Sequence, residues 1–304
     1  ANADLRSSVG LEKNHLLSTL LQASILGIRA VTFTGGGEPT LSPFLPMAIK
    51  KALSLGMEAA LITNGVVPPS NALLQLVPRM TWVRISLDAC DRESYAEAHG
   101  VPDKVFDRAI ENIRLYAEAA DGRCTVGVGY LTGEPSRDLG IVDAARLCAS
   151  LGVDYIQFRP ILYVPSDYRY HPGLFQVPAL LWEAGRQATK RFRVVSSAPK
   201  YQGMKLPAFG RTYTQCWGVY FACVVGATGD VYPCCHLHDP RFGLGNVYDK
   251  SFSNIWADSA ARDRVYRSIR LDADCAPMCR FHQHNQIIEG IVNARSAIEH
   301  GNYL

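Results

Sequence analysis

The sequence lacks the features that mark several large classes of protein. No apolar run reaches the ~20 residues that a membrane-spanning helix needs, and the longest, Leu16–Ala30, is interrupted by Ser18 and Arg29. Charged residues make up only 19% of the chain and the formal net charge is +3, so strong attraction to nucleic acid is not expected. A hydrophobic content of 48% argues against a disordered chain. We therefore expect a cytoplasmic globular protein with neither a nucleic-acid nor a membrane partner.

Cysteine is plentiful by comparison. The chain has nine cysteines, and Cys90, Cys124 and Cys148 are scattered, which is typical of packing residues. The other six lie between residues 216 and 279, and they are Cys216, Cys223, Cys234, Cys235, Cys275 and Cys279. In a chain that is not secreted, such clustering indicates metal or redox chemistry before disulfides.

The first two thirds of the chain alternate helical and strand patterns. Five short apolar strands are expected, at 30–34, 59–63, 81–87, 124–131 and 154–159, with helices between them. This alternation indicates βαβ units and a parallel sheet covered on both faces, an α/β fold. Because the chain begins on a helical pattern, a barrel of such units needs a further, first strand before Ala1.

The pattern changes towards the C-terminus. Residues 160–210 are rich in Tyr, Pro and Arg and are expected to be a linker with one helix at 178–190. Ala227-Thr228-Gly229 is a hairpin signal between two short strands, and helices are expected at 251–256, 260–269 and 283–300. At ~150 residues per domain, we predict two domains, residues 1–210 and a small α+β extension at 211–304.

Polar residues follow four of the expected strands. Carboxyl ends of parallel strands meet at one edge of a sheet, so these residues are expected to share a ligand site. They are Gly36, Gly37, Glu38, Thr63, Asn64, Ser86, Asp88, Gln157 and Arg159. The glycine run alone is also compatible with a simple tight turn, and it matches neither a dinucleotide fingerprint nor a phosphate loop.

The segment Val31–Pro39, which contains Gly35-Gly36-Gly37-Glu38, resembles a motif of the radical S-adenosylmethionine (SAM) enzymes. The resemblance implies a partial (β/α)6 barrel in which the glycine backbone and Glu38 hold the amino group of SAM. An ammonium group suits carboxylate and carbonyl acceptors. Residues 61–65 and 85–88 are similar to the next two strand ends of that family. By the same resemblance, Ser86 contacts the ribose or carboxylate of SAM, and His99 stands where an arginine often holds that carboxylate.

The later cysteines carry a second resemblance. Cys216, Gly229 and Cys234 have C-x12-G-x4-C spacing, and Cys275-x3-Cys279 follows. This is similar to the SPASM or shorter twitch extension of radical SAM enzymes, which holds auxiliary [4Fe–4S] clusters. The resemblance implies one cluster, in the twitch arrangement, ligated by Cys216, Cys234, Cys275 and Cys279. The alternative is a zinc site that uses the nearby Cys and His residues of 235–238 and 279–284.

Three further residues are candidates for catalysis. Cys223 and Cys235 are either hydrogen-atom donors to a substrate radical or small buried apolar residues. Cys235 has a third possibility as an alternative ligand. Arg159 is either a structural ion-pair partner or a clamp on an anion or hydroxyl group of the substrate.

The C-x3-C-x2-C motif that holds the radical-generating cluster of the family is absent from the printed sequence. We expect a native segment that ends in this motif before Ala1, without which the chain would not cleave SAM. The alternative is a degenerate protein.

The resemblance implies an oxidoreductase or epimerase. Its 5′-deoxyadenosyl radical would take a hydrogen atom from an unactivated carbon, with electrons from a flavodoxin or ferredoxin. The compact extension is similar to that of aminocyclitol dehydrogenases of antibiotic biosynthesis, so a sugar-like or aminocyclitol-like substrate is expected. The alternatives are modification of a ribosomal peptide and a non-catalytic, zinc-stabilised SAM-binding protein.

Overall fold

The computed structural model describes residues 10–161, 176–203, 210–275 and 279–297. Its contacts divide the chain into two compact units. Unit 1 consists of residues 1–161 and 170–197, and unit 2 of residues 162–169 and 198–304. The linker expected at 160–210 lies partly outside the described residues, as does the expected end of the last helix at residue 300.

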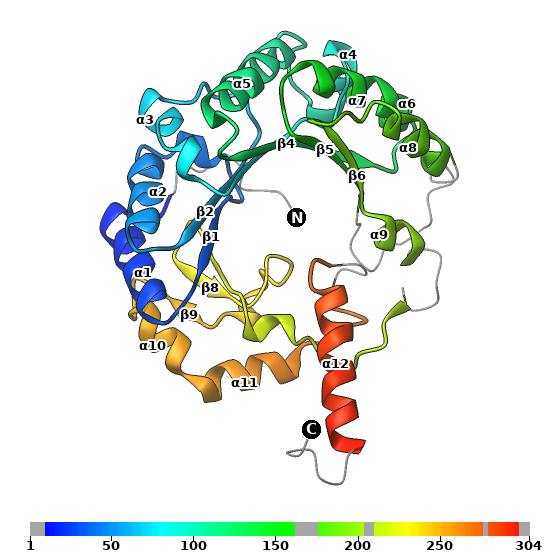
Figure 1. Cartoon of the computed structure of the whole chain (residues 1–304). Helices are drawn as coiled ribbons and strands as arrows, with labels where there is room; N and C mark the ends of the chain where they lie inside the picture. Colours follow the sequence, from blue (N-terminus) through cyan, green and yellow to red (C-terminus); the bar gives the residue numbers. More distant parts are fainter. Residues whose placement is uncertain (1–9, 162–175, 204–209, 276–278, 298–304) are drawn as a thin grey trace. The chain divides into compact units, whose positions relative to one another are not determined.

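Unit 1 is built on a six-stranded parallel sheet whose strand order follows the chain. The strands are β1 (Ala30–Phe33), β2 (Glu58–Thr63), β3 (Trp82–Ser86), β4 (Thr125–Thr132), β5 (Tyr155–Pro160) and β6 (Arg193–Ser196). Figure 1 shows this sheet as a curved layer with helices along its convex side. The prediction of an α/β fold with parallel βα units is therefore confirmed. The linker with one helix that was expected after β5 also contains a strand that was not predicted, because β6 pairs in parallel with β5.

The helices of unit 1 alternate with its strands, as the alternating pattern predicted. They are α1 (Lys13–Ile25), α2 (Leu45–Ser54), α3 (Asn71–Leu74), α4 (Arg92–His99), α5 (Val105–Ala120), α6 (Pro135–Leu139), α7 (Ile141–Ser150) and α8 (Val177–Gly185). Helix α4 was not predicted, and its ends explain why it forms. Asp91 and Ser94 form a capping box, and Gly100 ends the helix in the left-handed conformation.

The concave face of the sheet is partly polar. Along β3, Val83 and Ile85 are fully buried, whereas Arg84 and Ser86 between and after them are half-buried. Successive side chains of a strand point to opposite faces, so the buried pair faces the helices and the half-buried pair faces the concave side. The register places Arg84 beside Gly127 of β4.

Gly127 of β4 has no room for a side chain, because the ring of Tyr155 on β5 lies against it. A β-carbon at this position would lie 2.1 Å from the ring of Tyr155. We predict that Gly127→Ala lowers the free energy of unfolding by about 1–3 kcal/mol, because the ring must shift within a packed face. Chemical denaturation measures the change. Gly185→Ala is the control, since that exposed glycine at the end of α8 has no atom within 4 Å of a built β-carbon. Equal effects of the two substitutions would contradict the steric explanation.

Unit 2 contains a small antiparallel sheet and helices. The strands are β7 (Val224–Val225), β8 (Asp230–Tyr232) and β9 (Gly245–Asn246), and the helices are α9 (Ala198–Gly203), α10 (Phe252–Ala257), α11 (Ser259–Ser268) and α12 (His282–Ala297). Gly229 turns the hairpin at a φ of 87°, and a β-carbon there would lie 2.5 Å from the ring of Tyr248. Within the described ranges, no helix is long and apolar enough to cross a membrane.

Candidate functional site

The loop after β1 holds a carboxylate in a fixed position. Oε1 of Glu38 accepts hydrogen bonds from the hydroxyl groups of Thr40 and Thr63, both at 2.6 Å, and from the backbone N–H of Thr40. Oε2 accepts from the backbone N–H of Asn64 at 2.7 Å. These bonds join the ends of β1 and β2. A carboxylate offers about four acceptor positions, and Oε2 keeps one of them for a further donor.

The glycines beside Glu38 expose bare backbone. Gly36 and Gly37 are exposed, and nothing lies within 4 Å of a β-carbon built on either. Their backbone groups make no hydrogen bond to any described residue. Free N–H and C=O groups next to an oriented carboxylate match the ammonium and carboxylate of an amino acid. The end of β1 therefore fits the methionine part of SAM.

The end of β2 is a tight turn around Gly65. A β-carbon on Gly65 would lie 2.6 Å from Cγ2 of Ile85, and its φ is 73°. The side-chain oxygen of Asn64 accepts from the backbone N–H of Val66 at 2.9 Å, so that amide already serves the turn. Asn112 of α5, buried and absent from the sequence predictions, donates to the Gly65 carbonyl at 2.7 Å. Asn112 is a polar residue on the otherwise apolar face of α5, and that pattern could have identified it from the sequence.

The end of β3 brings Asp88 and His99 together. His99 contacts the Leu87 carbonyl through Nε2 at 3.0 Å and packs on the ring of Tyr95 at 4.4 Å. A carbonyl only accepts, so Nε2 carries the hydrogen of that bond. Nδ1 of His99 is then a donor only in the protonated imidazolium. The hydroxyl of Ser86 lies half-buried on the concave face and makes no hydrogen bond within the described chain.

Asp88 has an unusual backbone and an unusual environment. It adopts a φ of 56°, and its Oδ1 accepts from the backbone N–H of Leu131 at 2.7 Å. Burial raises the pKa of Asp88, although the Leu131 bond and the charges of His99, Arg137 and Arg159 oppose that rise.

This pKa predicts a pH-dependent effect of Asp88→Asn. The folded state penalises the charged form, so wild-type stability falls as pH rises from the unfolded pKa of ~3.9 through the raised folded value. Asparagine keeps the acceptor for Leu131 and tolerates the left-handed conformation. We expect the variant to unfold at a higher temperature than wild type at pH 7, with a difference that shrinks towards pH ~4. Thermal unfolding over this range measures it, and a pH-independent difference would contradict it.

Three of the predicted ligand cysteines lie in each other's electrostatic field in unit 2. Burial, and then the charges of Cys216 and Cys279, raise the pKa of Cys275 to about 12. Burial and Cys216 also raise the pKa of Cys279. Arg211 opposes both effects and donates to the carbonyl of Cys275 at 3.3 Å. A cation at this position would also stabilise thiolates that ligate a cluster.

The fourth predicted ligand, Cys234, shares a core with Cys216. Cys234 is buried with Val219 and Phe242, and Cys216 packs against this core. A hydrogen bond with Cys235, together with burial, raises the pKa of Cys234. The same bond lowers the pKa of Cys235, and Arg280 lowers it further.

Helix α12 braces the loop that carries Cys216. Oδ1 of Asn285 accepts from the backbone N–H groups of Trp217 and Gly218, and its Nδ2 contacts Sγ of Cys216 at 3.7 Å. Glu289 accepts from the indole of Trp217 at 2.6 Å. Both side chains are buried, and neither was predicted from the sequence. Their spacing of four residues puts them on one face of the helix, a signal that was present in the sequence.

The donor set fits a cluster better than a single zinc ion. Among the described residues, no group of three or more His, Cys, Asp or Glu could hold one metal ion. His282 instead bonds to the hydroxyl of Tyr213 at 3.2 Å, and His238 stacks on Tyr232. A [4Fe–4S] cluster takes four thiolates and separates them by its own volume.

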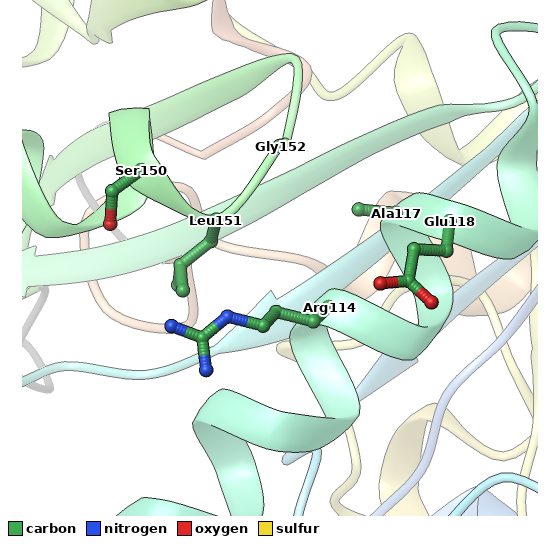
Figure 2. Close-up of a pocket in the computed structure, with 6 residues that line it drawn as sticks. All are labelled: Arg114, Ala117, Glu118, Ser150, Leu151 and Gly152. Carbon is green, nitrogen blue, oxygen red and sulfur yellow. The ribbon is translucent and has the colours of Figure 1, made fainter.

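The hollow drawn in Figure 2 lies away from these groups. It has a volume of about 320 Å³ and is lined by Arg114, Ala117, Glu118, Ser150, Leu151 and Gly152. These residues belong to the C-terminal half of α5 and the turn before β5. They therefore mark the amino ends of the strands, opposite to the predicted SAM site. This hollow adds nothing to the candidate site.

Comparison with known proteins agrees with both resemblances. Residues 10–145 match the family model described as the Radical SAM superfamily, and residues 216–281 match the SPASM model, an iron–sulfur cluster-binding domain. The chain is also similar to the Streptococcus suis protein SuiB, whose structure was determined with bound S-adenosylmethionine. The TM-score is 0.64 at 17% identity over 94% of this chain and 69% of SuiB, which shows a shared fold.

The names of the curated relatives describe different activities. An S-adenosylmethionine-dependent nucleotide dehydratase of Flammeovirga pacifica is 36% identical over 37% of this chain and 38% of its own length. An AdoMet-dependent heme synthase of Oleidesulfovibrio alaskensis is 25% identical over 84% of this chain and 69% of its own length. A PqqA peptide cyclase of Streptomyces rochei is 28% identical over 78% of this chain and 64% of its own length. The chain thus spans well under half of the dehydratase, and the substrate class differs among these relatives.

Proposed function

Because the chain belongs to the radical SAM superfamily and carries a SPASM-type iron–sulfur domain, we propose that it is an enzyme that binds SAM at the carboxyl ends of β1–β3. The observation that carries this proposal is the oriented carboxylate of Glu38 beside the unpaired backbone of Gly36 and Gly37. We further propose one auxiliary [4Fe–4S] cluster in unit 2, ligated by Cys216, Cys234, Cys275 and Cys279.

The residues at the rim orient SAM. Together with a reduced [4Fe–4S] cluster, SAM supplies the 5′-deoxyadenosyl radical that takes a hydrogen atom from the substrate. Oε2 of Glu38 would accept a hydrogen bond from the ammonium group, and the exposed backbone of Gly36 and Gly37 would hold the amino-acid part of SAM. Ser86 donates its free hydroxyl to the ribose or carboxylate. His99, anchored on the Leu87 carbonyl, contributes Nδ1 when protonated.

We propose a small-molecule substrate and a dehydrogenation or an epimerisation, in the cytoplasm. The nucleotide dehydratase and the heme synthase support a small molecule, since their names refer to small-molecule chemistry. A sugar-like substrate remains our specific proposal, and a peptide is the second candidate because of the peptide cyclase relative.

The environment of the two spare cysteines favours Cys223 as the hydrogen donor of an epimerase. Burial raises the pKa of Cys223 to about 11, so it keeps its S–H hydrogen at neutral pH. Cys235, by contrast, is exposed and directly follows the proposed ligand Cys234. In an epimerase, Cys223→Ala stops turnover while Cys235→Ala does not. In a dehydrogenase, neither change stops it.

Anaerobic reconstitution with iron and sulfide tests the cofactor proposal. We expect the chain as printed to bind about four iron atoms and to show the broad visible absorption of a [4Fe–4S] cluster. Equilibrium dialysis then measures SAM binding to the same preparation. Tight zinc binding without a cluster, or no SAM binding, would show that the proposal is wrong.

A further inference from the structure

The side chains of Arg84 and Arg159 both lie close to Gly129 on the concave face of unit 1. A β-carbon built on Gly129 would lie 3.6 Å from Cδ of Arg84 and 3.7 Å from Nη2 of Arg159. Nη1 of Arg84 donates to Oε1 of Gln157 at 3.3 Å, and Gln157 is the β5 residue paired with Gly129. The two guanidinium groups therefore lie next to each other over β4, because glycine leaves room for both.

Neither arginine is neutralised by a carboxylate in the described part of the chain. The ion pairs there do not include Arg84 or Arg159. The Nε atoms of both are buried without a hydrogen-bond partner among the described residues. Burial, and then the charge of Arg159, lower the pKa of Arg84 to about 10. Asp88 is the acid in their field, but it bonds to Leu131 and burial raises its pKa.

We propose that Arg84 and Arg159 form an anion subsite that binds a carboxylate or phosphate group of the substrate. Guanidinium groups present planar forks of N–H donors that match oxyanions, and two adjacent half-buried cations are unfavourable until an anion joins them. The ring of Trp82, 5.7 Å from the guanidinium carbon of Arg84, supports that side chain from the same strand. The subsite rests on the proposed function, in which the substrate occupies the concave face.

The position of the pair assigns it to the substrate rather than to SAM. The proposed SAM site lies at the carboxyl ends of β1, β2 and β3, around Glu38, Thr63 and Ser86. The arginines come from β3 and β5 and meet over β4. Arg84 also precedes Ser86 by two residues on the same face, so it lies deeper in the sheet than the rim.

Anion-dependent unfolding tests the subsite. Unfolding temperatures of the full chain are measured in inorganic phosphate, in acetate and in chloride at one ionic strength. We expect phosphate or acetate to raise the wild-type value by a few degrees over chloride, and Arg84→Gln and Arg159→Gln to lose this shift. Arg146→Gln, at an exposed arginine paired with Asp143, is expected to keep it. In chloride, Arg84→Gln should unfold at a higher temperature than wild type, since it removes one of two adjacent half-buried charges that have no carboxylate partner among the described residues.

The outcomes separate the alternatives. A shift with phosphate alone identifies a phosphorylated substrate, and a shift with acetate identifies a carboxylate. The proposal is overturned if neither anion stabilises wild type, if both arginine variants keep the full shift, or if Arg84→Gln weakens SAM binding in dialysis by tenfold or more. If the chain shows the anion shift but binds neither SAM nor iron, the subsite is supported and the proposed function is wrong.

Discussion

Cys275→Ala is expected to abolish the auxiliary cluster, with a fall from about four iron atoms per reconstituted chain to background. Cys275 is a half-buried thiol in the electrostatic field of Cys216 and Cys279. A [4Fe–4S] cluster is held by four thiolates, and this variant would leave three. Iron analysis and visible absorption after anaerobic reconstitution measure the loss.

The matched control is Cys148→Ala. Cys148 is fully buried in α7 of unit 1 and packs without any predicted ligand role. This variant removes the same atoms and should keep its iron. Stability gives a second readout, because a cluster that binds only the folded chain raises its unfolding temperature. Cys275→Ala should therefore lose stability relative to wild type only after reconstitution. An unchanged iron content in Cys275→Ala would exclude this residue as a ligand.

The order of strands and helices in unit 1 was predictable because each element carries its own pattern. Strands such as Ala30–Phe33 and Tyr155–Pro160 are short apolar runs between amphipathic helices, and the structure has them there. β6 was missed because Arg193–Ser196 is a four-residue segment with two polar ends, too short to show a period. α4 was missed because its helix depends on the capping of Asp91 and Gly100 rather than on an apolar stripe.

The candidate site also has residues that the sequence could predict and residues that it could not. Glu38 and its glycines form one contiguous motif, so the sequence alone pointed to them. Residues that act through distant partners gave no such signal. Arg84 meets Gln157 across 73 positions, and Asn285 meets Trp217 across 68. Each contacts a partner that is remote along the chain, and only the fold brings that partner close.

Glu38→Gln is expected to weaken SAM binding by roughly 10–100-fold, the value of a charged hydrogen bond of about 1.5–3 kcal/mol. The neutral amide cannot pair with the ammonium charge. It also has only one acceptor oxygen, so either Asn64 or the two threonines Thr40 and Thr63 lose their partner. Equilibrium dialysis with SAM measures the loss. Methylthioadenosine, which lacks the amino-acid part of SAM, should bind the variant and wild type equally.

A second variant separates binding from positioning at the same carboxylate. Thr40→Val removes the 2.6 Å hydroxyl bond to Oε1 of Glu38 but keeps the negative charge and the bonds from Thr63 and Asn64. If Glu38 acts by direct contact, Thr40→Val leaves the Kd for SAM within about twofold of wild type, since Oε2 is still held and still charged. Equal weakening by the two variants would instead mean that Glu38 serves the loop alone. The methylthioadenosine comparison then decides between the two roles, because a disordered loop weakens binding of both compounds, whereas a lost ammonium contact weakens only SAM.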